Sequence, residues 1–515
     1  MSEDAPVNTG AVQWPDPDSA YFAVRRMQTK LHRWAGADVS RRFGDLFNLV
    51  YDPAFLVHAW ERVSTNKGAR TPGIDKATVA LVESRVGVEE FLGQIRDSLK
   101  SGGFAPVEVR QVMIPKGDTG KFRKLGIPTI ADRVVQASLK AVLEPIFEAD
   151  FKPCSYGFRP NRRAHDAIAE IHHYGTSGYH WVLEADIEAC FDEISHTALM
   201  DRLRVRIKDK RVCALVKAFL KSGVFTQLGD REESLTGTPQ GGILSPLLAN
   251  IALSALDDHF DRHWHQQMGN KVARDRRRRH GQGNWKLIRY ADDFVLMVSG
   301  ERPHAEALRN EVAAVLAPLG LRLAPAKTRT VHIDEGFDFL GFHIRRMRKR
   351  GTQKYYVYTT PSRKAIQKVK DKVRAKTYRS TRHQELDTLI TSLNRSLRGW
   401  ANYFRHGVSK AVFGAVDNHA WLRLMRWTRA KYAGKHRLGM KDLRRRFCDQ
   451  DWRFAHNGVV FTGTSSVAVT RYRYRGSRMR PRGPRHRQPP PPAVDQRARH
   501  VESPVCGDAY AGCAP

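Results

Sequence analysis

The chain has 515 residues, and 87 Lys and Arg against 53 Asp and Glu give it a formal net charge of +34. A protein this basic is expected to bind a polyanion, DNA or RNA, and its length allows about two to four domains. No apolar run approaches the roughly 18 residues of a membrane span, and the start at Met1 lacks the regions of a signal peptide. We therefore expect a soluble intracellular protein and neither a membrane protein nor a secreted one.

The N-terminal part is expected to contain a disordered start, basic helices and a basic loop. Residues 1–20 are polar and Pro-rich, which predicts disorder. Residues 21–50 place apolar side chains at helical spacing, with Arg and Lys on the opposite face. Residues 65–75 are rich in Gly, Pro and cations, and this composition suits a loop against a phosphate backbone. A helical stretch follows through Lys100.

A cationic β-hairpin is predicted next. Residues 109–114 and 123–127 alternate like strands and lie on either side of the turn 115–120. Helical patterning then dominates, with one apolar strand at 181–186. The arginine run 274–280 interrupts this pattern and is expected to be a solvated loop, its role left open. We expect helices over 131–147, between Asn161 and Gly175, and over 196–222, 244–267 and 301–319.

Two adjacent acids, Asp292 and Asp293, are the most informative feature of the chain. They follow the strand-like run 286–289 and precede the apolar run 294–297, so a β-hairpin is predicted with both carboxylates at its tip. Asp186, at the end of the strand that begins at Trp181, supplies a third carboxylate. Nucleic-acid polymerases need acids presented in this way to hold magnesium ions.

Strands and then basic helices complete the chain. We expect a strand pair over 321–333, a strand over 337–345, and an α+β class because no repeating βαβ array is present. Beyond residue 350, three amphipathic helices rich in Lys and Arg suit docking on folded RNA. From Arg471 the composition of Arg, Gly and Pro predicts a mobile basic tail. The three helices are expected over 365–379, 384–404 and 413–432.

Eight sequence blocks, in order, resemble the reverse transcriptase/maturase proteins encoded by bacterial group II introns. The likeness runs from about Leu46 to Arg475, and a further motif at 397–404 is similar to the signature of the maturase domain. Eight blocks in this order are very hard to obtain by chance. The blocks are 66–75, 114–128, 155–160, 185–192, 238–250, 290–293, 327–328 and 339–342.

The resemblance implies a right-hand polymerase with fingers and palm, a helical thumb and an α-helical maturase domain. The expected divisions are a disordered N-terminus (1–20), a basic extension with the start of the fingers (21–105), reverse transcriptase fingers and palm (106–350), thumb (351–385), maturase (386–475) and a basic Pro/Arg-rich tail (476–515).

The resemblance also assigns roles to single residues. It implies that Asp186 and Asp292 bridge two Mg²⁺ ions, that Asp293 completes the acidic cluster and that the Ile187 carbonyl adds a ligand oxygen. Lys327 is expected to act as a general acid toward pyrophosphate, with a surface lysine as the alternative. Substrate-binding roles fall to Lys116, Arg123 and Lys124 at the triphosphate, to Phe191 as a gate against a 2′-hydroxyl or else a core residue, and to Gln240 and Gly241 at the base or template.

The implied activity is RNA-directed DNA synthesis from dNTPs, combined with assistance to intron splicing and target-primed mobility. Intron RNA and a DNA target or primer are the expected partners, with Arg398, Arg405 and Lys410 binding RNA. A cytoplasmic location in a bacterium, associated with the nucleoid, is expected, and the oligomeric state is left open, with a dimer as one option. The scattered cysteines show no paired CxxC spacing, so neither a zinc ribbon nor an HNH endonuclease is predicted. Two alternatives remain: a domesticated, defence-associated or diversity-generating reverse transcriptase, and a splicing-only RNA-binding maturase.

Overall fold

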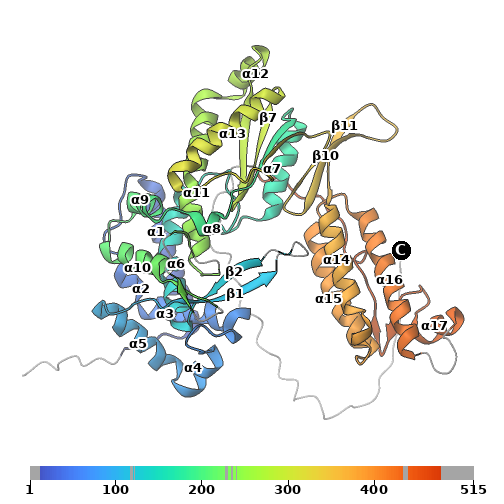
Figure 1. Cartoon of the computed structure of the whole chain (residues 1–515), viewed down its shortest axis with the longest axis horizontal. Coiled ribbons are helices and arrows are strands. Elements are labelled where there is room, and N and C mark those ends of the chain that lie inside the picture. The colour runs from blue at the N-terminus through green and yellow to red at the C-terminus, as the bar shows by residue number, and fades with distance from the viewer. Residues whose placement is uncertain are drawn as a thin grey trace, which may run out of the picture. The chain divides into compact units, whose positions relative to one another are not determined.

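The computed structural model describes residues 12–115, 120, 122–226, 230–232, 236–238, 241–432 and 439–476 (Figure 1). Two predicted site residues, Lys116 and Gln240, lie outside these described residues, and so does the part of the predicted tail that follows residue 476. Within the described part, no helix is both long enough and apolar enough to cross a membrane.

Helix α1 (Pro17–Ala37) begins inside the segment expected to be disordered. The Asp16 carboxylate caps it by accepting from the backbone N–H groups of Asp18 and Ser19, and Pro17 occupies the first turn, where its missing N–H costs nothing. The prediction of disorder through residue 20 is therefore wrong for residues 17–20, which are helical. The following helices are α2 (Phe47–Val50), α3 (Pro53–Ser64), a 3₁₀ turn (Lys67–Arg70), α4 (Val79–Arg85) and α5 (Val88–Ser101).

The buried helix α6 (Ile130–Asp150) organises this N-terminal part, because α1 and α3 pack on it. Its Arg133 donates to the carbonyl oxygens of Gly68, Thr71 and Pro128, at 2.7–2.9 Å. These bonds fix the Gly/Pro-rich loop, which was predicted as a loop from composition alone, against the start of α6.

The predicted cationic hairpin is confirmed as β1 (Val109–Pro115) and β2 (Phe122–Ile127), which pair antiparallel. Strand β4 (Val224–Phe225) adds to β1 in parallel, and β5 (Arg231–Glu232) pairs with β4. The resulting sheet has the order β2-β1-β4-β5.

A second four-stranded sheet carries the candidate site. Its order is β6-β7-β3-β8, with every neighbouring pair antiparallel, and its strands are β3 (Trp181–Ala185), β6 (Asn284–Tyr290), β7 (Asp293–Ser299) and β8 (Arg329–His332). Both faces are buried, because alternate residues of β3 and β7 belong to different cores. Leu183 and Leu296 face the core that holds α11 and α13, while Val182 and Val295 face the core that holds α7.

Helices surround this sheet at positions close to those expected. The arginine run is an exception, because it forms helix α12 (Lys271–Arg279) and not a loop. Asn270 caps α12, Arg is a good helix former, and Arg277 donates to Asn284 and Gly283. The other helices are α7 (Ala164–Thr176), α8 (Cys190–Glu193), α9 (His196–Arg206), α10 (Lys210–Lys221), α11 (Ser245–Arg262), which continues as a π-helix (His263–Gln267), and α13 (Arg302–Leu316), which ends in a 3₁₀ turn (Ala317–Leu319).

The strand pair expected over 321–333 is wrong, since β8 is its single strand and residues 321–328 form a bridge and a turn. A three-stranded sheet follows, with β9 (Phe337–Phe339), β10 (Phe342–Arg348) and the unpredicted β11 (Tyr355–Pro361) in the order β11-β10-β9.

The three expected C-terminal helices are present as α14 (Arg363–Lys376), α15 (Leu386–Phe404) and α16 (Lys410–Tyr432), and they share one core with α17 (Met440–Phe447). Phe404 is buried against Phe342, and the Tyr403 hydroxyl donates to the Leu340 carbonyl. These aromatics pack on protein, as their helical spacing predicts. The remaining elements are a 3₁₀ turn (Arg379–Thr381) and the short pair β12 (Ala455–His456) and β13 (Val459–Val460).

Candidate active site

The two adjacent acids lie at the tip of a hairpin, as expected. Strand β6 ends at Tyr290, β7 begins at Asp293, and Ala291 and Asp292 form the turn between the two strands. Ala291 has φ +58°, a left-handed conformation that a residue with a Cβ adopts at some cost. The surrounding structure must therefore hold this turn in place.

Gly157 packs closely against the backbone of this turn. A Cβ atom at this position would lie 2.3 Å from the Ala291 nitrogen and 2.9 Å from the Tyr290 carbonyl carbon, so only glycine fits. The Gly157 carbonyl accepts from the Asn250 side chain of α11 at 2.9 Å. The loop before α7 and helix α11 thus both contribute to holding the hairpin tip.

Arg289, the residue before Tyr290 at the end of β6, anchors the turn through a fully buried network. Its guanidinium pairs with both carboxylate oxygens of Asp257, at 2.5 and 2.8 Å, and both side chains are 0% exposed. It also donates to the Ala291 carbonyl (2.8 Å), to Asn250 (3.0 Å) and to the Ser155 hydroxyl (2.8 Å). A buried guanidinium with this many acceptors fixes the geometry of everything bonded to it.

Asp186 reaches the same place from β3. The pairing of Ala185 with Phe294 sets the end of β3 beside the start of β7, so the chain leaves β3 next to Asp293. The Asp186 backbone carbonyl accepts from Ala324 at 2.8 Å, and its carboxylate accepts from the Lys327 ammonium at 2.5 Å. Asp186, Asp292, Asp293 and Lys327, all predicted, are thus brought together.

Ile187 lies one residue further on and is buried. Its bridge to Leu323 is made by the Asp186 carbonyl and the Glu188 N–H. The Ile187 carbonyl is not one of the groups that make this bridge, so the geometry is compatible with its predicted role as a ligand oxygen.

The electrostatics of the acidic cluster favour a bound cation. Desolvation raises the pKa of Asp292, and repulsion from Asp186 adds to it. Asp293 is partly accessible to solvent, but surrounding protein atoms desolvate its carboxylate. This desolvation is the largest effect, repulsion from Asp292 and Asp186 adds to it, and together they raise the pKa of Asp293 to about 6. The hydrogen bond to Asp186 raises the pKa of Lys327. Three carboxylates that repel one another form a donor set suited to hard divalent cations.

Four of the predicted substrate-binding residues lie on other elements within the described part of the chain. Arg123 and Lys124 lie on β2 of the cationic hairpin, and the charge of Arg123 acts on Asp292. Gly241 has φ +115°, and a Cβ there would lie 2.6 Å from the Gly126 carbonyl oxygen of β2. The loop before α11 therefore packs tightly on the hairpin.

Phe191 stands on α8, five residues after Asp186. It is partly buried at the edge of the larger core, and its carbonyl accepts from the Thr238 N–H at 2.6 Å. This bond joins the segment that carries Phe191 to the loop that carries Gly241.

The predicted RNA-binding residues lie on or beside the C-terminal helices. Arg398 is exposed on α15, Lys410 is exposed at the start of α16, and Arg405 between them is partly buried. No structural contact assigns them a nucleic-acid role.

Gly157, Asn250, Asp257 and Arg289 were not predicted as site residues. Two signals pointed toward them. Arg289 is a charged residue that directly follows the apolar pair Leu287 and Ile288, and Gly157 and Asn250 belong to two of the blocks that carry the family resemblance. Their contacts with the hairpin tip depend on chain segments more than 30 residues away in sequence, and no local pattern reports such contacts.

The sequence of the chain is similar to known protein families and to individual proteins. Residues 114–344 match the family model for reverse transcriptase (RNA-dependent DNA polymerase), and residues 366–447 match the group II intron, maturase-specific domain. Protein YkfC of Escherichia coli is 38% identical over 364 residues, covering 66% of this chain and 93% of that protein.

The match with a second relative covers only part of that protein's length. The group II intron-encoded protein LtrA of Lactococcus lactis is 32% identical over 362 residues, covering 62% of this chain and 59% of LtrA. Among solved structures, Candida albicans telomerase in complex with a fragment of telomeric RNA aligns with a TM-score of 0.35 and 12% identity, over 68% of this chain and 63% of that one.

Proposed function

The chain belongs to the family of group II intron reverse transcriptases with a maturase domain, and we propose that it makes DNA on an RNA template at Asp186, Asp292 and Asp293. One observation carries this proposal: β3 and the β6–β7 turn converge to place three carboxylates together, with the pKa of Asp293 raised to about 6 by desolvation and mutual repulsion.

In this proposal, Asp186, Asp292, Asp293 and the Ile187 carbonyl hold two Mg²⁺ ions. When bound, the ions lower the energy of the attacking primer 3′-oxygen and of the leaving oxygen in in-line attack on an α-phosphate. Arg123 and Lys124 position the triphosphate, together with Lys116, which lies outside the described residues. Lys327 releases Asp186 to the metal and donates a proton to the pyrophosphate. Gln240 and Gly241 position the base or template.

The proposal also divides the chain. Fingers and palm extend to about residue 350, the thumb covers 351–385 and the maturase domain covers 386–475. The shared core of α14, α15 and α16 supports a close association of the thumb helix with the maturase helices.

The test is primer extension on an RNA template with purified protein, dNTPs and Mg²⁺. Magnesium-dependent extension is expected, and chelation should abolish it. If the folded protein binds a group II intron RNA but never extends a primer, a splicing-only maturase replaces the polymerase proposal. Extension without any intron RNA binding favours a reverse transcriptase with a non-intron role.

Phe191→Ala is expected to weaken selection against ribonucleotides. If the ring packs beneath the sugar, its removal opens space for a 2′-hydroxyl, and the ratio of kcat/KM for dNTP over rNTP should fall about 10- to 100-fold. Steady-state kinetics with both nucleotides measure the ratio. An unchanged ratio together with a lower melting temperature would assign Phe191 to the core instead.

Removal of three charges at Arg398, Arg405 and Lys410, by substitution with Gln, is expected to weaken binding of the intron RNA. For every phosphate that is no longer neutralised, the slope of log K against log salt should become shallower by about 0.7–0.9. Filter binding across a salt series measures the slope. The matched control removes three exposed charges elsewhere, at Lys271, Arg302 and Arg309. Equal slopes for the two triple variants would show that the C-terminal charges have no special role.

A further inference from the structure

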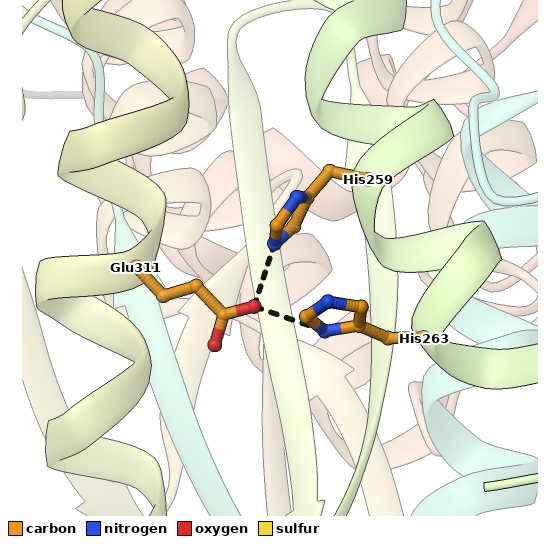
Figure 2. A group of neighbouring side chains, drawn as sticks. All are labelled: His259, His263 and Glu311. Carbon is orange, nitrogen blue, oxygen red and sulfur yellow. Dashed lines mark hydrogen bonds and ion pairs between the residues drawn. The ribbon is translucent and has the colours of Figure 1, made fainter. Parts of the chain in front are cut away.

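Two histidines and one glutamate converge between helices α11 and α13, outside the acidic cluster (Figure 2). His259 lies in the last turn of α11, His263 begins the π-helix that continues it, and Glu311 faces them from α13. The spacing of four residues places both imidazoles on one face of the helix. The possible metal-ligand atoms of the three side chains all lie within 4.8 Å of one another. Among the described residues, no other group of three or more His, Cys, Asp or Glu side chains meets this condition.

A single carboxylate oxygen faces both imidazoles. Glu311 Oε1 lies 2.6 Å from His259 Nε2 and 3.0 Å from His263 Nδ1 (Figure 2). The His263 Nδ1 atom is buried and, within the described part of the chain, makes no hydrogen bond of acceptable geometry despite this short distance. His263 Nδ1 is therefore a possible metal ligand that lies close to the Glu311 carboxylate but has no hydrogen-bond partner within the described residues.

The dimensions and accessibility fit a small metal ion. Tetrahedral zinc with bonds of about 2.0–2.2 Å separates its ligand atoms by about 3.3–3.6 Å, so small side-chain rotations would open the two distances from Glu311 to the imidazole nitrogens to that range. The three side chains are 20–28% exposed, which leaves a path for the ion and room for a water ligand.

The ligand atoms of this cluster favour a different metal ion from the one expected at the acidic cluster. Imidazole nitrogen suits Zn²⁺, whereas Mg²⁺ prefers oxygen ligands such as the carboxylates of the β6–β7 turn. We propose that His259, His263 and Glu311 form a Zn²⁺ site with two nitrogen ligands, one carboxylate oxygen and a water in the fourth position.

The site would join two helices that position the active site. Helix α11 carries Asn250 and Asp257, which contact the Gly157 loop and Arg289, and α13 packs on β3 and β7. A bound ion linking α11 to α13 would therefore stabilise the helical layer on one face of the palm sheet. This role differs from that of the magnesium ions, which would bind at the hairpin tip.

The experiment is zinc titration of the full-length, chelator-stripped protein with excess Mg²⁺ present, so that the acidic cluster is occupied. One tight Zn²⁺ per chain is expected, together with a higher melting temperature. Glu311→Gln and His259→Ala should each weaken this binding about 10- to 100-fold or more. The matched control is His265→Ala, an exposed histidine on the same π-helix whose contact is Asp261 and not the cluster. It should bind Zn²⁺ like the wild type.

X-ray absorption on the wild-type protein provides a readout that does not depend on any variant folding. Two imidazole nitrogens and light oxygen ligands at about 2.0–2.2 Å are expected. No tight Zn²⁺ in the wild type, a coordination shell without two imidazoles, or equal affinity in the wild type and Glu311→Gln would each overturn the proposal.

Discussion

Replacing Asp292 with asparagine is expected to lower primer extension by at least about a thousandfold, which corresponds to about 4 kcal/mol of transition-state stabilisation. Asparagine keeps the size and shape of the side chain but removes the negative charge that would bind both metal ions. Asp292 also stands in a turn whose backbone is fixed by Gly157 and Arg289, so the turn should keep its shape in the variant. Single-turnover extension at saturating dNTP and Mg²⁺ measures the loss.

The matched control for this variant is Asp97→Asn, the same chemical change at a surface position on α5 where the side chain is 76% exposed. It should extend primers at the wild-type rate. Equal RNA affinity of Asp292→Asn and the wild type would place the defect in chemistry and not in template binding. An Asp292→Asn protein within tenfold of the wild-type rate would contradict the assignment of this carboxylate to the metal site.

Arg289→Met is expected to destabilise the palm by about 3–5 kcal/mol and to abolish extension. Removing one member of a buried ion pair leaves the other charge uncompensated, and Asp257 is 0% exposed. The substitution also removes the donor to the Ala291 carbonyl, so the strained turn loses its anchor. Hydrogen exchange at β6 and β7 measures the loss of stability locally, because exchange from core strands reports the free energy of opening.

A second substitution separates stability from catalysis. In Arg289→Met/Asp257→Leu the buried charge is gone, and much of the stability should return, because apolar replacement of a buried ion pair is often nearly neutral. Extension should remain absent, since neither new side chain can donate to Ala291 or Ser155. Recovery of activity along with stability would show that the network is only structural. Arg302→Met, at the exposed pair with Glu306, serves as the control and should change stability by less than about 1 kcal/mol.

Local patterns predicted most elements of the palm and the C-terminal helices. The hairpin with Asp292 and Asp293 at its tip followed from two apolar runs around a short turn, and α15 ends at Phe404, where its apolar spacing ends. The pattern failed where local and tertiary effects compete. Four consecutive arginines resembled a solvated loop, yet Asn270 caps them as a helix and Asn284 accepts from Arg277. Residues 321–328 resembled a strand but supply the turn that brings Lys327 to Asp186.

Residue types and their order along the chain suffice to show which residues carry charge, which strands end in carboxylates and which family the blocks resemble. These properties are local, since each depends on residue types within one short segment. How the carboxylates are held depends on contacts between segments that are distant in sequence. Gly157, Asp257 and Arg289 come from three separate segments, and their contacts arise when the sheet packs against α7 and α11. The convergence of His259, His263 and Glu311 likewise depends on the packing of α11 against α13, which sequence spacing does not encode.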